Sequence, residues 1–235
     1  MTRKLGVLLA TVDGLDGGEV FIVATNLGRA SANRKVGDAA QVWSIPAGGL
    51  QGHQRDVCGS CPLMPQIEGG QGGCYVAKLF MSGIWRAIQA GAYPAWDGDT
   101  RDFDRLHIRF GAWGDPCLLP LPIVERIARA SLGWMGYSHE WKRPEVAPYA
   151  RYFMASVHTA QEAAEATSRG WRWFMTPFAG EAIPSGAIQC PHQTRGIQCR
   201  DCRLCDGHGH GKTVNIWNTP HGPKSVLPSF NQERN

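Results

Sequence analysis

The sequence of 235 residues contains no uninterrupted apolar run long enough to cross a membrane, since a spanning helix needs roughly 18 such residues. It also lacks internal repeats and low-complexity segments, which argues against repeat architectures. Hydrophobic residues make up 43% of the chain and charged residues 19%, a composition typical of globular proteins and not of disordered ones. One large domain or two small ones would account for this length.

The chain also has little net charge. Lys and Arg number 24 against 20 Asp and Glu, so the formal net charge is +4 at pH 7. Strong nucleic-acid binders usually concentrate far more positive charge on one face. The composition therefore permits a nucleic-acid partner without requiring one.

A secretory signal is not evident at the start of the chain. Arg3 and Lys4 are basic and residues 5–10 are apolar, which is the order found in a signal peptide. The apolar stretch is short, however, and Asp13 and Asp16 follow it without a small-residue cleavage site. We therefore expect these residues to form the first strand of a cytoplasmic protein that has no membrane partner.

The eight cysteines fall into two groups, and their spacing is that of metal sites. Cys-x2-Cys steps let two thiolates from one tight turn reach the same metal, and disulfides are not expected in the cytoplasm. Cys117 stands apart, and we expect it to be a packed thiol. The first group is Cys58, Cys61 and Cys74, and the second is Cys190, Cys199, Cys202 and Cys205.

Two kinds of metal site compete for the second group. A four-cysteine zinc site usually uses two separate Cys-x2-Cys knuckles, whereas the double step from Cys199 to Cys205 is typical of a [4Fe–4S] cluster. The fourth ligand of such a cluster is often followed by proline, as Cys190 is here. We favour the cluster and keep zinc as the alternative, with additional candidate ligands in His192, His208, His210 and His221.

The first group supplies three thiolates without an obvious fourth ligand. The glycine-rich residues 69–73 would let Cys74 fold back onto the Cys58-Gly-Ser-Cys61 pair. A cubane cluster held by three cysteines leaves one iron open for another ligand. The alternatives are a redox-active pair or plain buried thiols.

Hydrophobic periodicity predicts an α/β protein. Strands followed by helices along the chain favour a parallel sheet with crossover connections, here a partial (β/α) barrel with a C-terminal cysteine-rich metal-binding extension. In such a layout the functional loops share the carboxyl edge of the strands. Strands are expected at residues 7–10, 20–23, 41–46, 106–110, 134–137, 152–157, 171–175 and 214–217, and helices at 76–91, 122–132 and 160–168.

The same pattern divides the chain into four segments. Residues 1–57 hold N-terminal strands and a loop, and residues 58–180 form the barrel-like core. Residues 181–222 contain the cysteine-rich segment and the last strand, and residues 223–235 form a loose tail.

Three polar residues follow predicted strands and are candidates for a site. Asp115 lies in a glycine-rich turn and would either cap the next turn or bind a ligand. His139 and His158 each follow a strand and are the catalytic candidates, the alternative being ordinary hydrogen-bonded histidines.

The order of parts resembles the core of radical-SAM enzymes over roughly residues 55–180. In that family a three-cysteine motif precedes a helix, and the next strand ends in a Gly-Gly-Glu-Pro type motif that holds the amino group of S-adenosylmethionine. Here Cys58, Cys61 and Cys74-Tyr75 precede the predicted helix, and the next strand ends in Gly111-Ala-Trp-Gly114-Asp115-Pro116. The gaps of two and twelve residues differ from the family's usual Cys-x3-Cys-x2-Cys.

This resemblance implies specific ligands. The first cysteine group would hold a [4Fe–4S] cluster, and S-adenosylmethionine would contact Gly111, Gly114, Asp115 and, through a ribose-contacting strand, Ser156. The second group would resemble the auxiliary clusters of some family members. An electron donor would be a required partner.

The chain also resembles uncharacterised proteins of phages and mobile elements, so its compartment would be the host cytoplasm. The shared segments are residues 58–62, 74–76, 111–116 and 136–141, together with the terminal cysteines. That resemblance brings no known activity.

Two functional hypotheses follow. The first is an iron–sulfur enzyme of radical-SAM type, which acts on a small-molecule or nucleic-acid substrate that the sequence does not specify. The second is a zinc-stabilised nucleic-acid-binding or nucleobase-modifying phage protein without radical chemistry. In the second, basic residues around the terminal cysteines would contact phosphates: Arg195, Arg200, Arg203 and Lys212.

Overall fold

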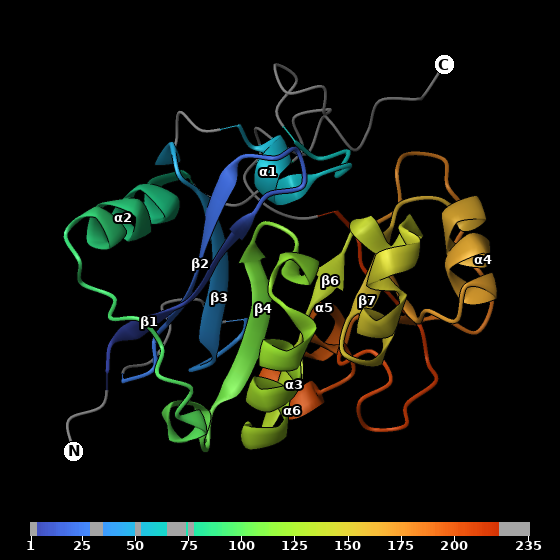
Figure 1. Ribbon diagram of the computed structural model, residues 1–235. Helices are drawn as coiled ribbons and strands as arrows, with labels where there is room; N and C mark the ends of the chain where they lie inside the picture. Colours follow the sequence, from blue (N-terminus) through green and yellow to red (C-terminus); the bar gives the residue numbers. More distant parts are fainter. Residues whose placement is uncertain (1–3, 29–34, 50–52, 65–73, 75–77, 221–235) are drawn as a thin grey trace.

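The computed structural model describes residues 4–28, 35–49, 53–64, 74 and 78–220 and contains two five-stranded sheets (Figure 1). The first sheet has the order β1-β2-β3-β4-β5, and β3, β4 and β5 run parallel. β1 and β2 form an antiparallel hairpin that extends the sheet beyond β3. The strands are β1 (Gly6–Asp13), β2 (Glu19–Thr25), β3 (Ala40–Pro46), β4 (His107–Trp113) and β5 (Gly133–Met135).

The second sheet has the order β6-β7-β8-β10-β9 and is parallel at each of its pairings. Its strands are short, and they alternate with helices and loops along the chain. The strands are β6 (Tyr137–Ser138), β7 (Met154–Val157), β8 (Trp173–Met175), β9 (Ile188–Gln189) and β10 (Ile216–Trp217).

Gly136 alone separates β5 from β6, so one segment of chain passes from the first sheet into the second. Its carbonyl accepts the N–H of Met154 at 3.0 Å, and its N–H donates to the carbonyl of Cys205 at 3.2 Å. A Cβ atom at this position would lie 2.6 Å from the ring of Phe153. Glycine therefore allows the close packing at which the single predicted strand of residues 134–137 becomes two.

The helices are spread along the chain, and two begin at recognisable sequence signals. Thr159 caps α4 by accepting the N–H of Glu162, and Pro122 lies in the first turn of α3. The α-helices are α1 (Arg55–Cys58), α2 (Lys78–Gln89), α3 (Leu121–Ala130), α4 (Ala160–Ser168), α5 (Pro191–Arg195) and α6 (Cys199–Cys202). The 3-10 helices are η3 (Thr100–Phe103), η4 (Pro116–Leu118), η5 (Glu140–Lys142) and η6 (Pro144–Arg151).

Side chains alternate between the two faces of the second sheet. Ala155 and Trp173 pack with Ala163 and other residues of the main core, on the side of α4. Met154 and Phe174, one position away in each strand, pack instead with Cys190 and its neighbours. The cysteine-rich segment therefore covers the face of this sheet opposite α4.

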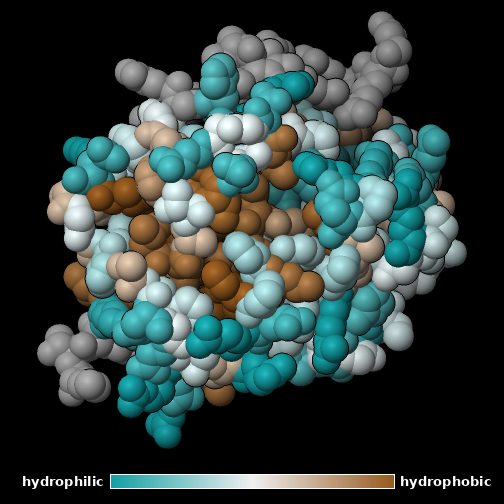
Figure 2. Space-filling model, viewed as in Figure 1, coloured by the Kyte–Doolittle hydropathy of each residue, from teal (hydrophilic) through white to brown (hydrophobic). Residues whose placement is uncertain are grey.

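The first sheet is covered less completely. Figure 2 shows apolar side chains gathered over its strands, between α2 and α3, with polar side chains around them. Phe21 of β2 contacts Trp85 of α2 there, with ring centroids 6.2 Å apart.

The predicted α/β class with parallel strands is confirmed, and most predicted elements appear with shifted ends. β4 extends to Trp113, β7 begins at Met154, and β8 begins at Trp173. Because β3 pairs with β4, the hydrogen bonding of the sheet crosses the predicted boundary at residue 57. The predicted tail of residues 223–235 lies outside the described residues. None of the described helices is both long and apolar enough to cross a membrane.

Candidate functional site

The Cys58–Cys61 loop follows β3 and is tied to the ends of β4 and β6. The carbonyl of Val57 accepts the N–H of Asp115 at 2.6 Å. The N–H and the hydroxyl of Ser60 both donate to Oε1 of buried Glu140, at 2.7 and 2.8 Å. Loops that follow three different strands therefore meet at one edge, as the parallel layout predicts.

Cys61 and two histidines form a chain of contacts at this edge. The sulfur of Cys61 lies 3.8 Å from Nε2 of His139, which lies 3.0 Å from Nε2 of His158. Nδ1 of His158 lies 2.8 Å from the carbonyl of Thr176. A carbonyl only accepts, so Nδ1 of His158 carries a proton, and its Nε2 in the neutral ring accepts from Nε2–H of His139.

A neutral His139 fits this arrangement. Burial lowers the pKa of His139 well below its ordinary value, and neighbouring His158 lowers it further. Nδ1 of neutral His139 is then left as an acceptor. The pair therefore offers a proton acceptor beside the cysteine loop.

The thiols of the first group lie close enough to influence one another. Burial raises the pKa of both Cys58 and Cys61 well above the ordinary value, and the neighbouring Cys74 thiol adds to both shifts. The N–H of Leu63 donates to the sulfur of Cys61, which opposes the rise. The three thiols thus lie near enough to raise one another's pKa, and the sulfur of Cys61 already accepts a backbone N–H.

Asp115 holds two loops together. Its carboxylate is buried and accepts the N–H of Cys117 at 3.0 Å, the N–H of His139 at 2.8 Å and the hydroxyl of Ser138 at 2.9 Å. Burial raises its pKa to about 6, against the effect of these hydrogen bonds. Both carboxylate oxygens accept hydrogen bonds from the protein itself, as expected if Asp115 caps the turn that follows it.

The remaining predicted residues of this edge have local roles. Gly111 and Gly114 have φ angles of +65° and +77°, which favour glycine in this turn. The carbonyl of Ser156 accepts Nε1–H of Trp141 at 3.1 Å. The thiol of Cys117 donates to the Ser138 hydroxyl at 3.3 Å, in line with the expected packed thiol.

The second cysteine group surrounds one pocket. Cys190 follows β9, Cys199 and Cys202 lie at the two ends of α6, and Cys205 follows three residues later. The pocket has about 370 Å³ of empty space, part of it open to solvent, and has a mostly apolar lining. It is lined by all four cysteines together with Lys35, Met135, Tyr137, Pro191, His192, Ile197, Leu204 and Ile216.

Hydrogen bonds and nearby cations act on these thiols. Burial raises the pKa of Cys199, Cys202 and Cys205, and the neighbouring thiols raise each pKa further. The N–H of Leu204 donates to the sulfur of Cys202, and the hydroxyl of Tyr137 donates to that of Cys205. Both contacts favour the thiolate, which is the form that binds metals.

The histidines proposed for a zinc shell are differently placed. His192 lines the pocket, with Nδ1 3.3 Å from the carbonyl of Ile197. His208 contacts the carbonyl of Gly170 at 3.0 Å, and His210 pairs with Asp206, so these two have partners away from the pocket. His221 lies outside the described residues.

The basic residues near the second group also have internal partners. Arg200 forms an ion pair with Asp38 at 2.8 Å, and Nε of Arg203 donates to the carbonyl of Arg200 at 3.1 Å. Lys212 donates to the carbonyl of Arg203. Arg195 lies near enough to lower the pKa of Cys202.

Sequence reasoning missed three residues that shape these sites: Tyr137, Glu140 and Arg172. Tyr137 and Glu140 flank Ser138 and His139 in a segment singled out for its motif. Neither residue type gave a signal of its own, because glutamate is mostly exposed in folded proteins and tyrosine is only intermediate in burial.

Among the described residues, no three His, Cys, Asp or Glu side chains have the arrangement that would hold a single metal ion. Comparisons with family models, curated proteins and solved structures found no match to this chain.

Proposed function

We propose that this protein is an iron–sulfur enzyme of radical-SAM type, with a cluster of open coordination on Cys58, Cys61 and Cys74 and a second cluster on the C-terminal cysteines. The proposal rests chiefly on one observation: Cys61, His139 and His158 come from three separate loops and meet at the carboxyl edge of parallel strands. That edge is where α/β proteins bind ligands.

The donor sets suit iron–sulfur clusters. Thiolates are the soft ligands that such clusters take from proteins. Each group contains a sulfur that accepts a backbone N–H, Cys61 from Leu63 and Cys202 from Leu204. Hydrogen bonds of this kind stabilise thiolates and tune the potentials of clusters.

When bound, a cluster with one open iron would chelate S-adenosylmethionine and supply one electron to its sulfonium. The chain's own residues would shape that site. Glu140 fixes the cysteine loop through Ser60, and Asp115 fixes the loops after β4 and β6. His158 holds the His139 ring beside Cys61.

The fold is compatible with this function. Parallel pairings run from β3 to β5 and again from β6 to β10, joined at Gly136, and we propose that together they form a partial (β/α) barrel. The substrate would be a small molecule or a nucleic acid, the electron donor a separate reductant, and the compartment the host cytoplasm. The alternative is a zinc-stabilised nucleic-acid-binding or nucleobase-modifying protein without radical chemistry, which would contain zinc in place of iron and sulfide.

Reductive cleavage of S-adenosylmethionine tests the proposal. The full chain is purified without air, reduced with dithionite and incubated with S-adenosylmethionine, and 5′-deoxyadenosine and methionine are quantified. We expect both products from the wild type and from Cys117→Ser, and neither from Cys61→Ser. Absence of both products from iron-loaded wild-type protein, or equal yields from Cys61→Ser, would overturn the radical-SAM assignment.

A further inference from the structure

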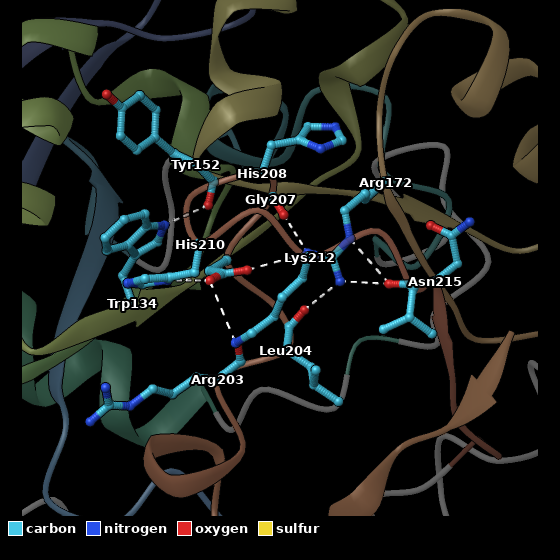
Figure 3. A network of polar contacts seen from close by, with 12 residues as sticks. Trp134, Tyr152, Arg172, Arg203, Leu204, Gly207, His208, His210, Lys212 and Asn215 are labelled. Carbon is cyan, nitrogen blue, oxygen red and sulfur yellow. Dashed lines mark hydrogen bonds and ion pairs between the residues drawn. The ribbon is translucent and has the colours of Figure 1, made fainter.

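Arg172 is a buried arginine whose guanidinium lies beneath the second cysteine group. It precedes β8, and its side chain is 3% exposed. Figure 3 shows the guanidinium surrounded by the loop that follows Cys202 and by the segment before β10. A buried cation requires partners for its charge and for its five N–H donors.

The partners of Arg172 are mostly backbone carbonyls of the cysteine-rich segment. Nη2 donates to the carbonyl of Leu204 at 2.7 Å, and Nε donates to that of Val214 at 3.1 Å. Nη1 donates to the carbonyl of Gly207 and to Oδ1 of Asp206, the latter at 3.2 Å. The guanidinium therefore joins two segments that are close in space but separated in the chain.

Asp206 supplies the opposite charge and is itself fully buried. Its other oxygen pairs with His210 and lies 3.9 Å from Nζ of Lys212 (Figure 3). Asp206 immediately follows Cys205, so anchoring Asp206 also restrains the backbone at the adjacent cysteine.

The loop between the last two cysteines has a conformation that needs such support. Arg203 has a φ of +53°, in the left-handed region that residues other than glycine rarely adopt. The next residue, Leu204, donates its N–H to the sulfur of Cys202 and its carbonyl accepts from Arg172. The carbonyl of Cys205 accepts the N–H of Gly136 at 3.2 Å.

We infer that Arg172 is a positioning residue for the second cluster: it holds the loop from Arg203 to Gly207 in the shape that points Cys202 and Cys205 into the common pocket. This inference rests on the proposed function, because it assumes that the four cysteines bind a cluster. Lysine would not replace Arg172, because its N–H donors all extend from one nitrogen. They do not reach all the acceptors that the planar guanidinium contacts through its three nitrogens.

Metal retention in the full chain tests this role. Cys58→Ser and Cys61→Ser are introduced together, so that the second cysteine group alone contributes to the visible and paramagnetic resonance spectra. Arg172→Lys is then compared with Arg169→Lys, an exposed arginine that pairs with Glu165. We expect Arg172→Lys to release iron to a chelator about 10- to 100-fold faster than its parent and to alter the resonance spectrum, and Arg169→Lys to match the parent.

A second variant separates positioning from folding. Arg172→Met with Asp206→Leu removes both buried charges together, a change that folds often tolerate. If its circular dichroism matches that of the parent, this double variant should still release iron faster than the parent does. Parent-like retention in either folded variant would overturn the inference. Loss of folding in both would overturn it as well, because Arg172 would then support the fold and not the loop.

The iron content of the parent protein tests the proposed second cluster separately from the role of Arg172. If Cys202→Ser in that parent leaves the iron content unchanged, the proposed second cluster fails whatever Arg172 does. If Cys202→Ser removes the iron and Arg172→Lys does not affect its release, the proposed function stands and only the positioning role fails.

Discussion

The sulfur of Cys61 lies 3.8 Å from Nε2 of His139, 78 positions later in the chain. The contact joins the loop after β3 to the loop after β6, and His158 extends it to the loop after β7. None of these three loops alone would bring the cysteine and the two histidines together. The parallel strands do so, because they deliver all three loops to the same edge.

Cys61→Ser should lower the iron content of anaerobically purified protein by about four atoms per chain, the content of one cubane cluster. Cys117→Ser is the matched control, since Cys117 lies at the same edge but its thiol donates a hydrogen bond to the Ser138 hydroxyl. Iron analysis of both variants checks this. Equal iron loss in the two variants would show that the effect comes from disturbing the edge and not from removing a ligand.

Cys202→Ser should remove metal from the second site and loosen the chain around it. Metal binding and local folding are coupled where ligands come from short, irregular segments, and α5 and α6 have only five and four residues. Hydrogen exchange should become faster across residues 190–205 and stay unchanged in α4. Unchanged exchange near the cysteines together with normal metal content would contradict this prediction.

Glu140→Leu should lower the free energy of unfolding of the metal-free protein by about 1.5 to 3 kcal/mol, because the N–H and the hydroxyl of Ser60 would lose their carboxylate acceptor. Glu140→Gln keeps an oxygen at that position and should cost about 1 kcal/mol or less. Urea unfolding of the two variants measures the difference. If both cost the same, the tie between Glu140 and the cysteine loop contributes no stability.

The α/β order and the positions of the three longest helices, α2, α3 and α4, could be predicted from the sequence, because hydrophobic periodicity is local. The Thr159–Glu162 pair that begins α4 is such a local signal. The break at Gly136 could not be predicted, since it depends on the ring of Phe153, which immediately precedes β7.

The candidate residues could be grouped from the sequence only by topology. Parallel strands predict that the loops containing Asp115, His139 and His158 share an edge, and they do so. The orientation of a side chain is a tertiary property, however. The sequence left open whether Asp115 binds a ligand or caps a turn, and the backbone donors that surround it become visible only in the fold.

Gly136→Ala should destabilise the protein by about 1 to 3 kcal/mol, the usual effect of overpacking, because a Cβ there would lie 2.6 Å from Phe153. Gly83→Ala in α2 is the control, since a Cβ at that position would have no heavy atom within 4 Å apart from its chain neighbours and the backbone of its own helix. Thermal unfolding of both variants tests this. A Gly136→Ala protein as stable as the wild type would mean that the sheets are not joined as described.

The central claim is that both cysteine groups hold iron–sulfur clusters, and the metal content of the full chain tests it most directly. Protein purified without air should be brown and contain about eight iron and eight sulfide per chain, as two cubane clusters require, with little zinc. A colourless protein that contains zinc and no acid-labile sulfide would contradict the account.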